Sequence, residues 1–252
     1  MTITKIHQHT FTQNATDCNP QGHLSPQDLV RHLIQVATEA ADLLGCGWDS
    51  MRDHGTIWVL SRLAFEMESY PRAAEKFTVT TWVESFNRLY SSRCFEITDG
   101  AGKVIGYARS MWVPIDFQTR RPARLEDFSY LSEAPVDRPC PIAPPARLRV
   151  PRSPSRTDAY TFRVSDLDLN RHVRSVAYVE LAIDQLTPAD YDSATLRRLD
   201  IDYRREAHWG DSAEIAVSTA SDGGTTVTDV AVSLDGEPVN LCRLTLISNN
   251  TI

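Results

Sequence analysis

Two patterns of apolar and polar residues run along this chain. The first is a segment, 26–44, that is apolar on most sides, as expected of a helix buried in a core. Ser25 is a good N-cap, and Pro26 and Asp28 occupy positions that a helix start favours. Gly45 can close the other end. The sequence therefore predicts a long buried helix over 26–44.

A second apolar run of helical type lies at 173–183 and predicts another buried helix. The remaining segments mostly alternate between apolar and polar residues, as half-buried β-strands do. Asp-Gly pairs, which favour hairpin turns, separate several of them. The clearest alternating segments are 59–67, 78–84 and 104–115, and the Asp-Gly pairs lie at 99–100, 222–223 and 235–236. The pattern predicts antiparallel sheet around two helices.

The chain contains an internal repeat, which is its most informative feature. Three segments of the first half align without gaps on three segments of the second half, in the same order. Short β segments can look alike by chance, but three matches in order favour two copies of one unit. The matched segments are 17–24 with 166–173, 62–67 with 198–203, and 102–109 with 236–243.

A proline-rich stretch separates the two copies and holds seven of the chain's 14 prolines. Proline removes backbone donors and fixes φ, so this stretch is predicted to be an extended linker on the surface. The predicted domains are an N-terminal unit at 1–132, the linker at 133–155 and a C-terminal unit at 156–252. Each unit has a strand, a helix and several further strands. An antiparallel sheet wrapped around a buried helix, twice over, is an α+β tandem hotdog fold.

Composition excludes several classes of function. The formal net charge of −7 and the pI near 5.5 argue against a nucleic acid partner, which demands a basic face. Five scattered cysteines, none in a CxxC pair, indicate thiols and not disulfides or a zinc site. The amino terminus lacks the apolar core of a signal peptide, and no stretch approaches the roughly 20 apolar residues of a membrane span. We therefore expect a cytoplasmic protein.

The strongest candidate for chemistry is His172, one of seven histidines. Alternation would place Asp168, Asn170 and His172 on one side of an extended segment that runs into the start of the second helix. A helix start also offers unpaired backbone amides to a developing negative charge. A carboxylate, an amide, an imidazole and free amides would then converge.

Other interpretations of this segment are open. It begins like a calcium loop, but Arg171 stands at the glycine position and Ala177 at that of the bidentate acid. A transition metal would need a second histidine or further carboxylates nearby in the sequence, so no metal is expected. A plain turn in which Asp168 and Asn170 cap the helix is the main alternative on these residues alone.

The chain resembles the plant and bacterial acyl-acyl carrier protein (acyl-ACP) thioesterases. Their second hotdog carries an Asp-x-Asn-x-His element, matched here by 168–172, and a downstream Tyr-Arg-Arg-Glu stretch, matched by 203–206. Both motifs stand in the family's order, and the likeness extends over nearly the whole chain. Further matched segments are the turn at 45–47, Trp58 to Arg62, Tyr70-Pro71, Thr81 to Val83 and Ser110 to Val113.

The resemblance implies hydrolysis of the thioester that links a fatty acyl chain to the carrier's phosphopantetheine arm, with no cofactor. Glu206 or His172 would deprotonate a water, and Glu206 is the preferred base if burial raises its pKa. Asn170 and the helix-start amides would hold the oxyanion. Asp168 would orient Asn170 and His172 or, as a lesser alternative, attack the carbonyl directly.

Two positions depart from the family's pattern. Some members have a cysteine directly after the motif glutamate, where this chain has Ala207, so a thiol nucleophile at that place is excluded. The family commonly carries two asparagines just beyond the histidine, where this chain has Arg174 and Ser175. The second departure bears on the helix cap and on substrate preference more than on the reaction.

The first copy lacks the candidate chemistry. The residues that replace Asp168, Asn170 and Glu206 there are Asn19, Gln21 and Tyr70. His23 alone persists, and it is predicted to be structural. By resemblance, the first unit supplies the acyl tunnel instead, although each of its candidate lining residues is equally compatible with plain core. These lining residues are Trp58, Leu60, Phe65 and Trp82.

Carrier protein is acidic, so arginines are expected to dock it. One arginine cluster follows the first unit and another flanks the candidate site, and either is equally compatible with an ordinary solvated surface. The predicted docking residues are Arg120, Arg121, Arg124, Arg171 and Arg174.

Several alternatives stay open at this point. An acyl-coenzyme A thioesterase of hotdog type would act on the same thioester and acyl chain. A hotdog dehydratase uses a related histidine and carboxylate on 3-hydroxyacyl substrates, but Asn170 favours hydrolysis. A non-catalytic acyl-binding module would bind without turnover, and the intact set of site residues weighs against it. A homodimer is open, and the acyl chain length is not predicted.

Overall fold

The computed structural model describes residues 4–87, 89–123 and 128–249, and its centre is one antiparallel sheet. The strands are β1 Ile6–Thr12, β2 Thr56–Met67, β3 Lys76–Phe86, β4 Ser91–Asp99, β5 Val104–Asp116, β6 Arg156–Thr161, β7 Ala194–Tyr203, β8 Ser212–Asp222, β9 Thr225–Leu234 and β10 Glu237–Ser248. Within the described residues the sheet has ten strands in the order β1-β3-β4-β5-β2-β7-β10-β9-β8-β6. Each half of the sheet therefore repeats the other about its centre.

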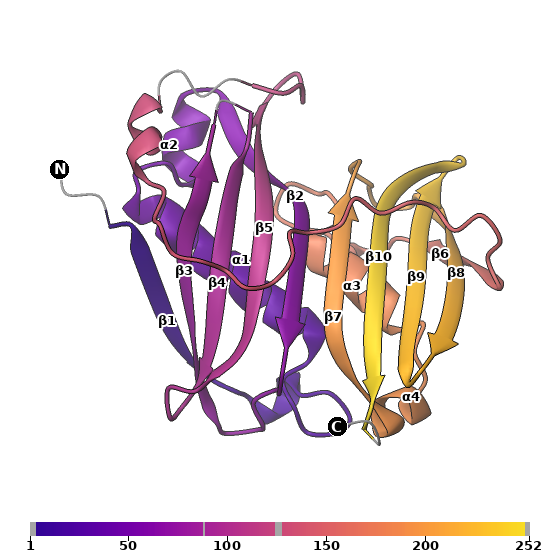
Figure 1. Cartoon of the computed structure of the whole chain (residues 1–252). Coiled ribbons are helices and arrows are strands. Elements are labelled where there is room, and N and C mark those ends of the chain that lie inside the picture. Colours follow the sequence, from indigo (N-terminus) through magenta and orange to yellow (C-terminus); the bar gives the residue numbers. More distant parts are fainter. Residues whose placement is uncertain (1–3, 88, 124–127, 250–252) are drawn as a thin grey trace.

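The internal repeat explains this symmetry. Strands β2 and β7 contain the matched segments 62–67 and 198–203, and they pair with each other in the middle of the sheet, with Arg62 opposite Asp202 and Glu66 opposite Arg198. This pairing joins the two copies into a single sheet (Figure 1). The predicted Asp-Gly hairpin turns are confirmed, because they connect β4 to β5, β8 to β9 and β9 to β10.

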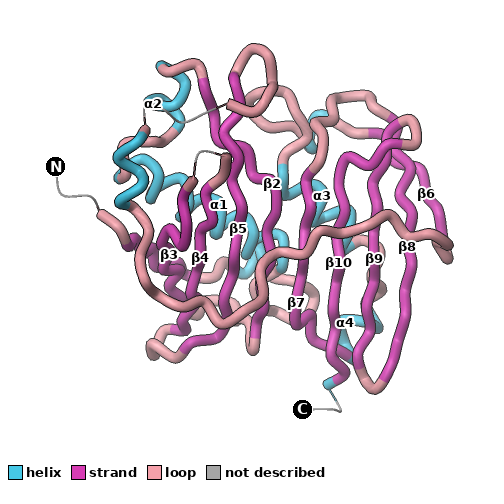
Figure 2. The backbone as a smooth tube through the Cα atoms, turned by 45° about the horizontal axis from the view of Figure 1, so that its top comes forward, coloured by secondary structure: helices cyan, strands magenta, loops and turns pink. Residues whose placement is uncertain are grey.

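Helices cover one face of the sheet. Figures 1 and 2 show the two longer ones, α1 and α3, on the same side of it, one behind each half. The α-helices are α1 Pro26–Leu43, α2 Trp48–Asp53, α3 Ser175–Ile183 and α4 Pro188–Ser193, and the 3-10 helices are η1 Ala15–Asp17, η2 Ser129–Glu133 and η3 Val164–Asp166. Within the described residues, no helix is both long and apolar enough to cross a membrane.

Local chemistry accounts for the two buried helices. Ser25 caps α1 as predicted, because its Oγ accepts from the Asp28 amide at 3.3 Å, and Gly45 follows the helix at φ +74°. The second helix begins at Ser175 and not at Val173, because the Val173 amide donates to the Ala207 carbonyl at 2.8 Å. Both helices pack on the sheet in one continuous apolar core. The fold is the predicted α+β tandem hotdog.

The segment between the two units crosses the opposite face of the sheet (Figure 1). The Val136 amide donates to the Val83 carbonyl at 2.9 Å, and the Ala146 amide donates to Asp200 Oδ1 at 2.9 Å. Arg204 donates to the Leu148 carbonyl at 2.6 Å. These bonds fasten the segment across both halves of the sheet.

His32, on α1, gives the fold a specific pH dependence. Its ring lies 4.1 Å from that of Phe11, and burial, followed by the charge of Arg31, lowers the pKa of His32 to about 4. In the unfolded chain His32 takes up a proton near pH 6.5, whereas in the folded chain it does so only near pH 4. The free energy of unfolding is therefore unaffected by His32 above pH 6.5 and falls as the pH drops from 6.5 towards 4. The resulting loss in the free energy of unfolding should reach about 3 kcal/mol at most.

We expect His32→Phe to remove this part of the pH dependence. The buried Nδ1 of His32 has no hydrogen-bond partner among the described residues, so phenylalanine leaves no partner unsatisfied. Denaturant unfolding at pH 5 and pH 7.5 measures the effect: the difference between the two pH values should shrink in the variant. An unchanged difference would show that other groups take up the protons.

Candidate active site

The segment around His172 is a tight turn and not the extended segment that was expected. The Asp168 carboxylate Oδ1 accepts from the backbone amides of Asn170 at 2.8 Å and of His172 at 3.1 Å. The Asp168 amide in turn donates to the His172 carbonyl at 2.8 Å, and Arg171 takes the left-handed conformation at φ +64°. Simple alternation was wrong here, because the aspartate folds the chain back on itself. Asp168 thus orients its neighbours through the backbone.

The structure brings His172 and Glu206 together from two loops of the second unit. His172 Nδ1 lies 3.4 Å from Glu206 Oε1. The loops are held side by side by the hydrogen bond from the Val173 amide to the Ala207 carbonyl and by a β-bridge between His172 and His208. The two histidine rings meet edge to face at 5.1 Å. A half-buried imidazole and a carboxylate therefore form a fixed pair.

Arg120 comes from the first unit and forms an ion pair with this same glutamate, Glu206. It lies in the turn after β5, which the Asp116 carboxylate holds by accepting from the amides of Gln118 and Thr119. Strand β5 is the direct neighbour of β2 in the sheet, so its following turn reaches the loops of the second unit. The predicted docking residue Arg120 is thus part of the candidate site.

The surroundings of His172 favour its neutral form. Burial is the main cause that lowers the pKa of His172, and the positive charge of Arg120 lowers it further, while Asp168 opposes the shift. The imidazole is therefore uncharged at neutral pH, and its ring nitrogens can accept or relay a proton.

Arg120→Ala should raise the pKa of His172, because removal of the nearby positive charge makes protonation easier. A histidine-ring NMR titration of the two proteins measures this shift directly. Arg121→Ala is the matched control, since Arg121 is an exposed neighbour in the same turn. Equal titration of wild type and Arg120→Ala would contradict the electrostatic coupling.

The first unit repeats the turn without the chemistry. Asn19 Oδ1 accepts from the amides of Gln21 at 3.1 Å and His23 at 3.0 Å, which is the geometry of Asp168. Gly22 takes the left-handed conformation at φ +76°, in place of Arg171. The hydroxyl of Tyr70, in the place of Glu206, donates to the Leu196 carbonyl at 2.7 Å. The first copy therefore keeps the scaffold and lacks the carboxylates.

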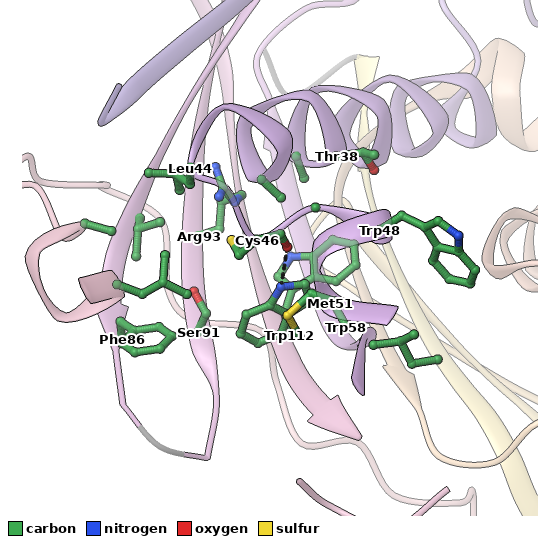
Figure 3. Close-up of a pocket in the computed structure, with 17 residues that line it drawn as sticks. Thr38, Leu44, Cys46, Trp48, Met51, Trp58, Phe86, Ser91, Arg93 and Trp112 are labelled. Atoms are coloured by element: carbon green, nitrogen blue, oxygen red, sulfur yellow. Dashed lines mark hydrogen bonds between the residues drawn. The ribbon is translucent and has the colours of Figure 1, made fainter. Parts of the chain in front are cut away.

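An apolar cavity of about 130 Å³ lies in the first unit between α1, α2 and the sheet (Figure 3). Trp58 lines it, and its indole donates to the Cys46 carbonyl at 3.1 Å. A backbone hydrogen bond links the wall of the cavity to the turn that carries Arg120: the Phe117 amide in that turn donates to the Gly55 carbonyl at 2.9 Å, and Gly55 precedes the lining residue Ile57 by two positions. Other lining residues are Ala37, Ala41, Met51, Val83 and Phe86.

The other three predicted lining residues do not line this cavity. Leu60 and Phe65 are buried in the main core. Trp82 faces the other side of the sheet, where its indole donates to the Arg138 carbonyl at 3.1 Å beneath the linker. Side chains alternate between faces, so Val83 lines the cavity and Trp82 cannot.

Arg93 lines the cavity and was not predicted. It is buried on β4, donates to Thr81 Oγ1 at 3.3 Å, and burial lowers its pKa to about 10, so it stays charged at neutral pH. Arg93 follows Ser91 by two residues in an alternating strand, and both line the cavity. A charge on the buried face of a strand is the signal that identifies it.

The remaining predicted docking arginines differ in their surroundings. Arg174 pairs with Glu180 at 2.8 Å. Arg121 and Arg171 are exposed, and Arg124 lies outside the described residues. Within the part of the chain that the structure describes, no cluster of three or more histidine, cysteine, aspartate or glutamate side chains could hold a metal ion.

A double hotdog with a histidine–glutamate pair in one unit and an apolar cavity in the other is the class of protein that the fold and the site define. Sequence models of the acyl-ACP thioesterase N-terminal domain and C-terminal domain match residues 4–130 and 151–245. The chain therefore belongs to the acyl-ACP thioesterase family.

Relatives and solved structures agree with this assignment. The oleoyl-acyl carrier protein thioesterase of Coriandrum sativum is 30% identical over 193 residues, which is 72% of this chain and 52% of the relative. This chain thus spans about half the length of the curated relatives it matches. An acyl-ACP thioesterase from Bacteroides thetaiotaomicron is 33% identical with a TM-score of 0.87, covering 96% of this chain and 97% of that one. The 12:0-ACP thioesterase from Umbellularia californica, at 20% identity, shares the fold with a TM-score of 0.85 over 97% and 94% of the two chains.

Proposed function

We propose that this protein hydrolyses fatty acyl-ACP to a free fatty acid and holo-ACP, and so ends chain elongation. The His172–Glu206 pair, at 3.4 Å in the second unit of a chain from this family, is the observation that carries the proposal. The names of the relatives support the same substrate class, since they describe oleoyl- and palmitoyl-ACP thioesterases.

In the proposed mechanism Glu206 takes a proton from a water that attacks the thioester carbonyl. The guanidinium of Arg120 stabilises the ionised glutamate that this step requires. Asn170 and the first amides of α3 hold the oxyanion, each such donor contributing about 2.7–4 kcal/mol. The carbon–sulfur bond then breaks, and neutral His172 relays the proton from Glu206 to the leaving thiolate. Asp168 keeps the turn in shape through its two amide hydrogen bonds.

The first unit is proposed to hold the acyl chain. Its apolar cavity supports this role, and the hydrogen bond from the Phe117 amide to the Gly55 carbonyl connects the cavity wall with the turn that carries Arg120. In this division the unit at 1–132 binds the acyl chain, the unit at 156–252 carries out the hydrolysis, and 133–155 joins them. The cytoplasmic location and the homodimer stay predictions.

Ala41→Phe should shift the chain-length preference towards shorter acyl groups, because the phenyl ring fills part of the cavity between α1 and the sheet. Leu43→Phe is the matched control, since Leu43 lies on the same helix and is largely exposed to solvent. Hydrolysis rates on a series of acyl-ACP substrates, from about eight to about eighteen carbons in two-carbon steps, measure the preference. An unchanged profile for Ala41→Phe would show that the chain binds elsewhere.

Thiol release from matched acyl-ACP and acyl-coenzyme A substrates tests the function itself. Faster release from the carrier substrate is the expected result. Release from coenzyme A alone would assign the chain to the acyl-coenzyme A thioesterases. Tight acyl binding with no release from either substrate would instead indicate a non-catalytic acyl-binding module.

A further inference from the structure

An exposed apolar patch lies beside the candidate site. Its members, Val164, Leu169 and Trp209, are 74%, 85% and 66% exposed, which makes them the most exposed large apolar side chains among the described residues. They come from three places in the second unit: the 3-10 turn η3, the His172 turn and the loop after β7. Val164 and Trp209 line the same hollows, and Leu169 directly follows Asp168, which lines one of them. Large apolar side chains exposed in one region are typical of a contact surface.

The patch continues into the candidate site. Val164 and Trp209 together line two open hollows on the surface, and one of these also includes Arg171 and His208. His208 is bridged to His172 through the backbone, with the two rings 5.1 Å apart. A flexible arm on a partner bound at Trp209 would therefore need to extend only past His208 to reach the histidine–glutamate pair.

Two cations flank the patch. Arg163 and Arg171 are exposed, and neither has an ion-pair partner among the described residues. By contrast, the nearby Arg120 and Arg174 are paired with glutamates. The carboxylates of Asp168 and Asp211 at the same place already accept from backbone amides. The two unpaired guanidinium groups are therefore the charges that an acidic partner can pair with.

The surface is held in shape before any partner binds. Asp166 accepts from the Arg163 amide at 2.7 Å and from the Tyr160 hydroxyl at 3.0 Å, which fixes the turn that presents Val164. Arg171 adopts φ +64°, where the equivalent residue of the first unit is Gly22. A side chain is thus present at a backbone position that favours glycine, which is consistent with a function for that side chain.

We propose that Arg163, Val164, Leu169, Arg171 and Trp209 form a docking face for acidic carrier protein. The apolar side chains meet apolar residues of the carrier, and the two arginines pair with its carboxylates at the rim, as in other protein interfaces. The carrier's pantetheine arm then enters past His208 to His172. This inference rests on the proposed hydrolysis of acyl-ACP and assigns the carrier to one face of the second unit.

The test compares two substrates with the same acyl chain, one on carrier protein and one on N-acetylcysteamine, which lacks the carrier. Trp209→Ser should raise KM for the carrier substrate about thirtyfold, and the double variant Arg163→Glu/Arg171→Glu about tenfold or more. Both should leave kcat/KM for the N-acetylcysteamine substrate within about twofold. The effect of the double variant should shrink at high salt.

Arg149→Glu and Val150→Ser serve as matched controls, because these exposed residues lie on the linker. They should change neither substrate's KM. Equal losses on both substrates for Trp209→Ser would overturn the docking face, and so would a KM for the carrier substrate that matches wild type. If Trp209→Ser raised KM for acyl-coenzyme A as much as for the carrier substrate, the docking face would be overturned, because the residue would then bind the pantetheine arm that both substrates share.

Carrier binding by calorimetry separates this inference from the proposed function. If holo-carrier protein binds to wild type and this binding is lost in Trp209→Ser, the docking face is supported. This holds even if no thioester is cleaved, in which case only the proposed function would fail. Hydrolysis of acyl-carrier with full carrier binding by Trp209→Ser would keep the function and reject the face.

Discussion

His172→Ala is expected to lower kcat on acyl-ACP by about a thousandfold, as the loss of a residue that transfers protons typically does. The imidazole lies 3.4 Å from Glu206 and is held neutral at physiological pH, so it is placed to pass a proton to the leaving thiolate. Its backbone position is set by Asp168, which the substitution leaves intact. KM should change little, since the cavity that we propose for the acyl chain lies in the other unit. Thiol release under single-turnover conditions measures the chemical step.

His23→Ala is the matched control for this prediction. His23 occupies the same turn in the first unit, with its amide bound to Asn19 at 3.0 Å, but it has no glutamate at the equivalent of position 206. We expect it to leave kcat within about threefold, an effect on stability alone. If His23→Ala reduced kcat as strongly as His172→Ala, the assignment of the site to the second unit would be wrong.

The internal repeat made much of the fold predictable from the sequence. The gapless match of 17–24 with 166–173 corresponds to two turns with the same hydrogen bonds, down to a left-handed residue at 22 and at 171. The match works because each turn depends on one short polar side chain, Asn19 or Asp168, that accepts from two amides. Local chemistry of this kind can be identified in the sequence.

The contact between Arg120 and Glu206 could not be predicted in this way. It depends on which strands meet at the centre of the sheet, and neither hydrophobic periodicity nor the repeat determines that β2 pairs with β7. The arginine is 86 residues away in the sequence and belongs to the other copy. Charge alone suggested a docking role, whereas the order of the strands brings the side chain to the glutamate.

The walls of the cavity were predictable only in part, for a related reason. Trp58 and Trp82 are both large and lie in apolar strands, so hydrophobic pattern predicts both equally as lining residues. The linker covers one face of the sheet and the helices cover the other, so residues on both faces are buried. Burial by itself therefore does not tell which face a tryptophan occupies, and the register of the strand decides it.

Comparison of the two copies indicates what the second copy adds to the shared scaffold. Both have the turn, the histidine and the neighbouring loop, but Tyr70 donates its hydroxyl to a carbonyl where Glu206 pairs with a guanidinium. The second copy thus gains a carboxylate and, through Arg120, a counter-charge from the first copy. The candidate site is complete only because the two units share one sheet.

Glu206→Gln is expected to lower kcat by about a thousandfold with KM within a few-fold of wild type, because glutamine keeps the size of the side chain and cannot accept the proton from water. The substitution also removes the ion pair with Arg120. Glu68→Gln is the control for the loss of an ion pair, since Glu68 pairs with Arg197 at 3.6 Å just after the C-terminal end of β2. This control should leave kcat unchanged. Full activity of Glu206→Gln would transfer the role of base to His172.

The double variant Arg120→Ala/Glu206→Gln separates the role of the arginine from that of the glutamate. If Arg120 acts by stabilising the ionised form of Glu206, its removal should reduce kcat in the wild-type background and have little further effect once the glutamate is gone. Additive losses would instead mean that Arg120 contacts the substrate directly. Thermal unfolding of all three variants checks that they are folded, because Arg120 loses its partner when the glutamate is replaced. A coupled pair would show that the first unit contributes a residue to catalysis, in addition to the acyl-binding role proposed for it.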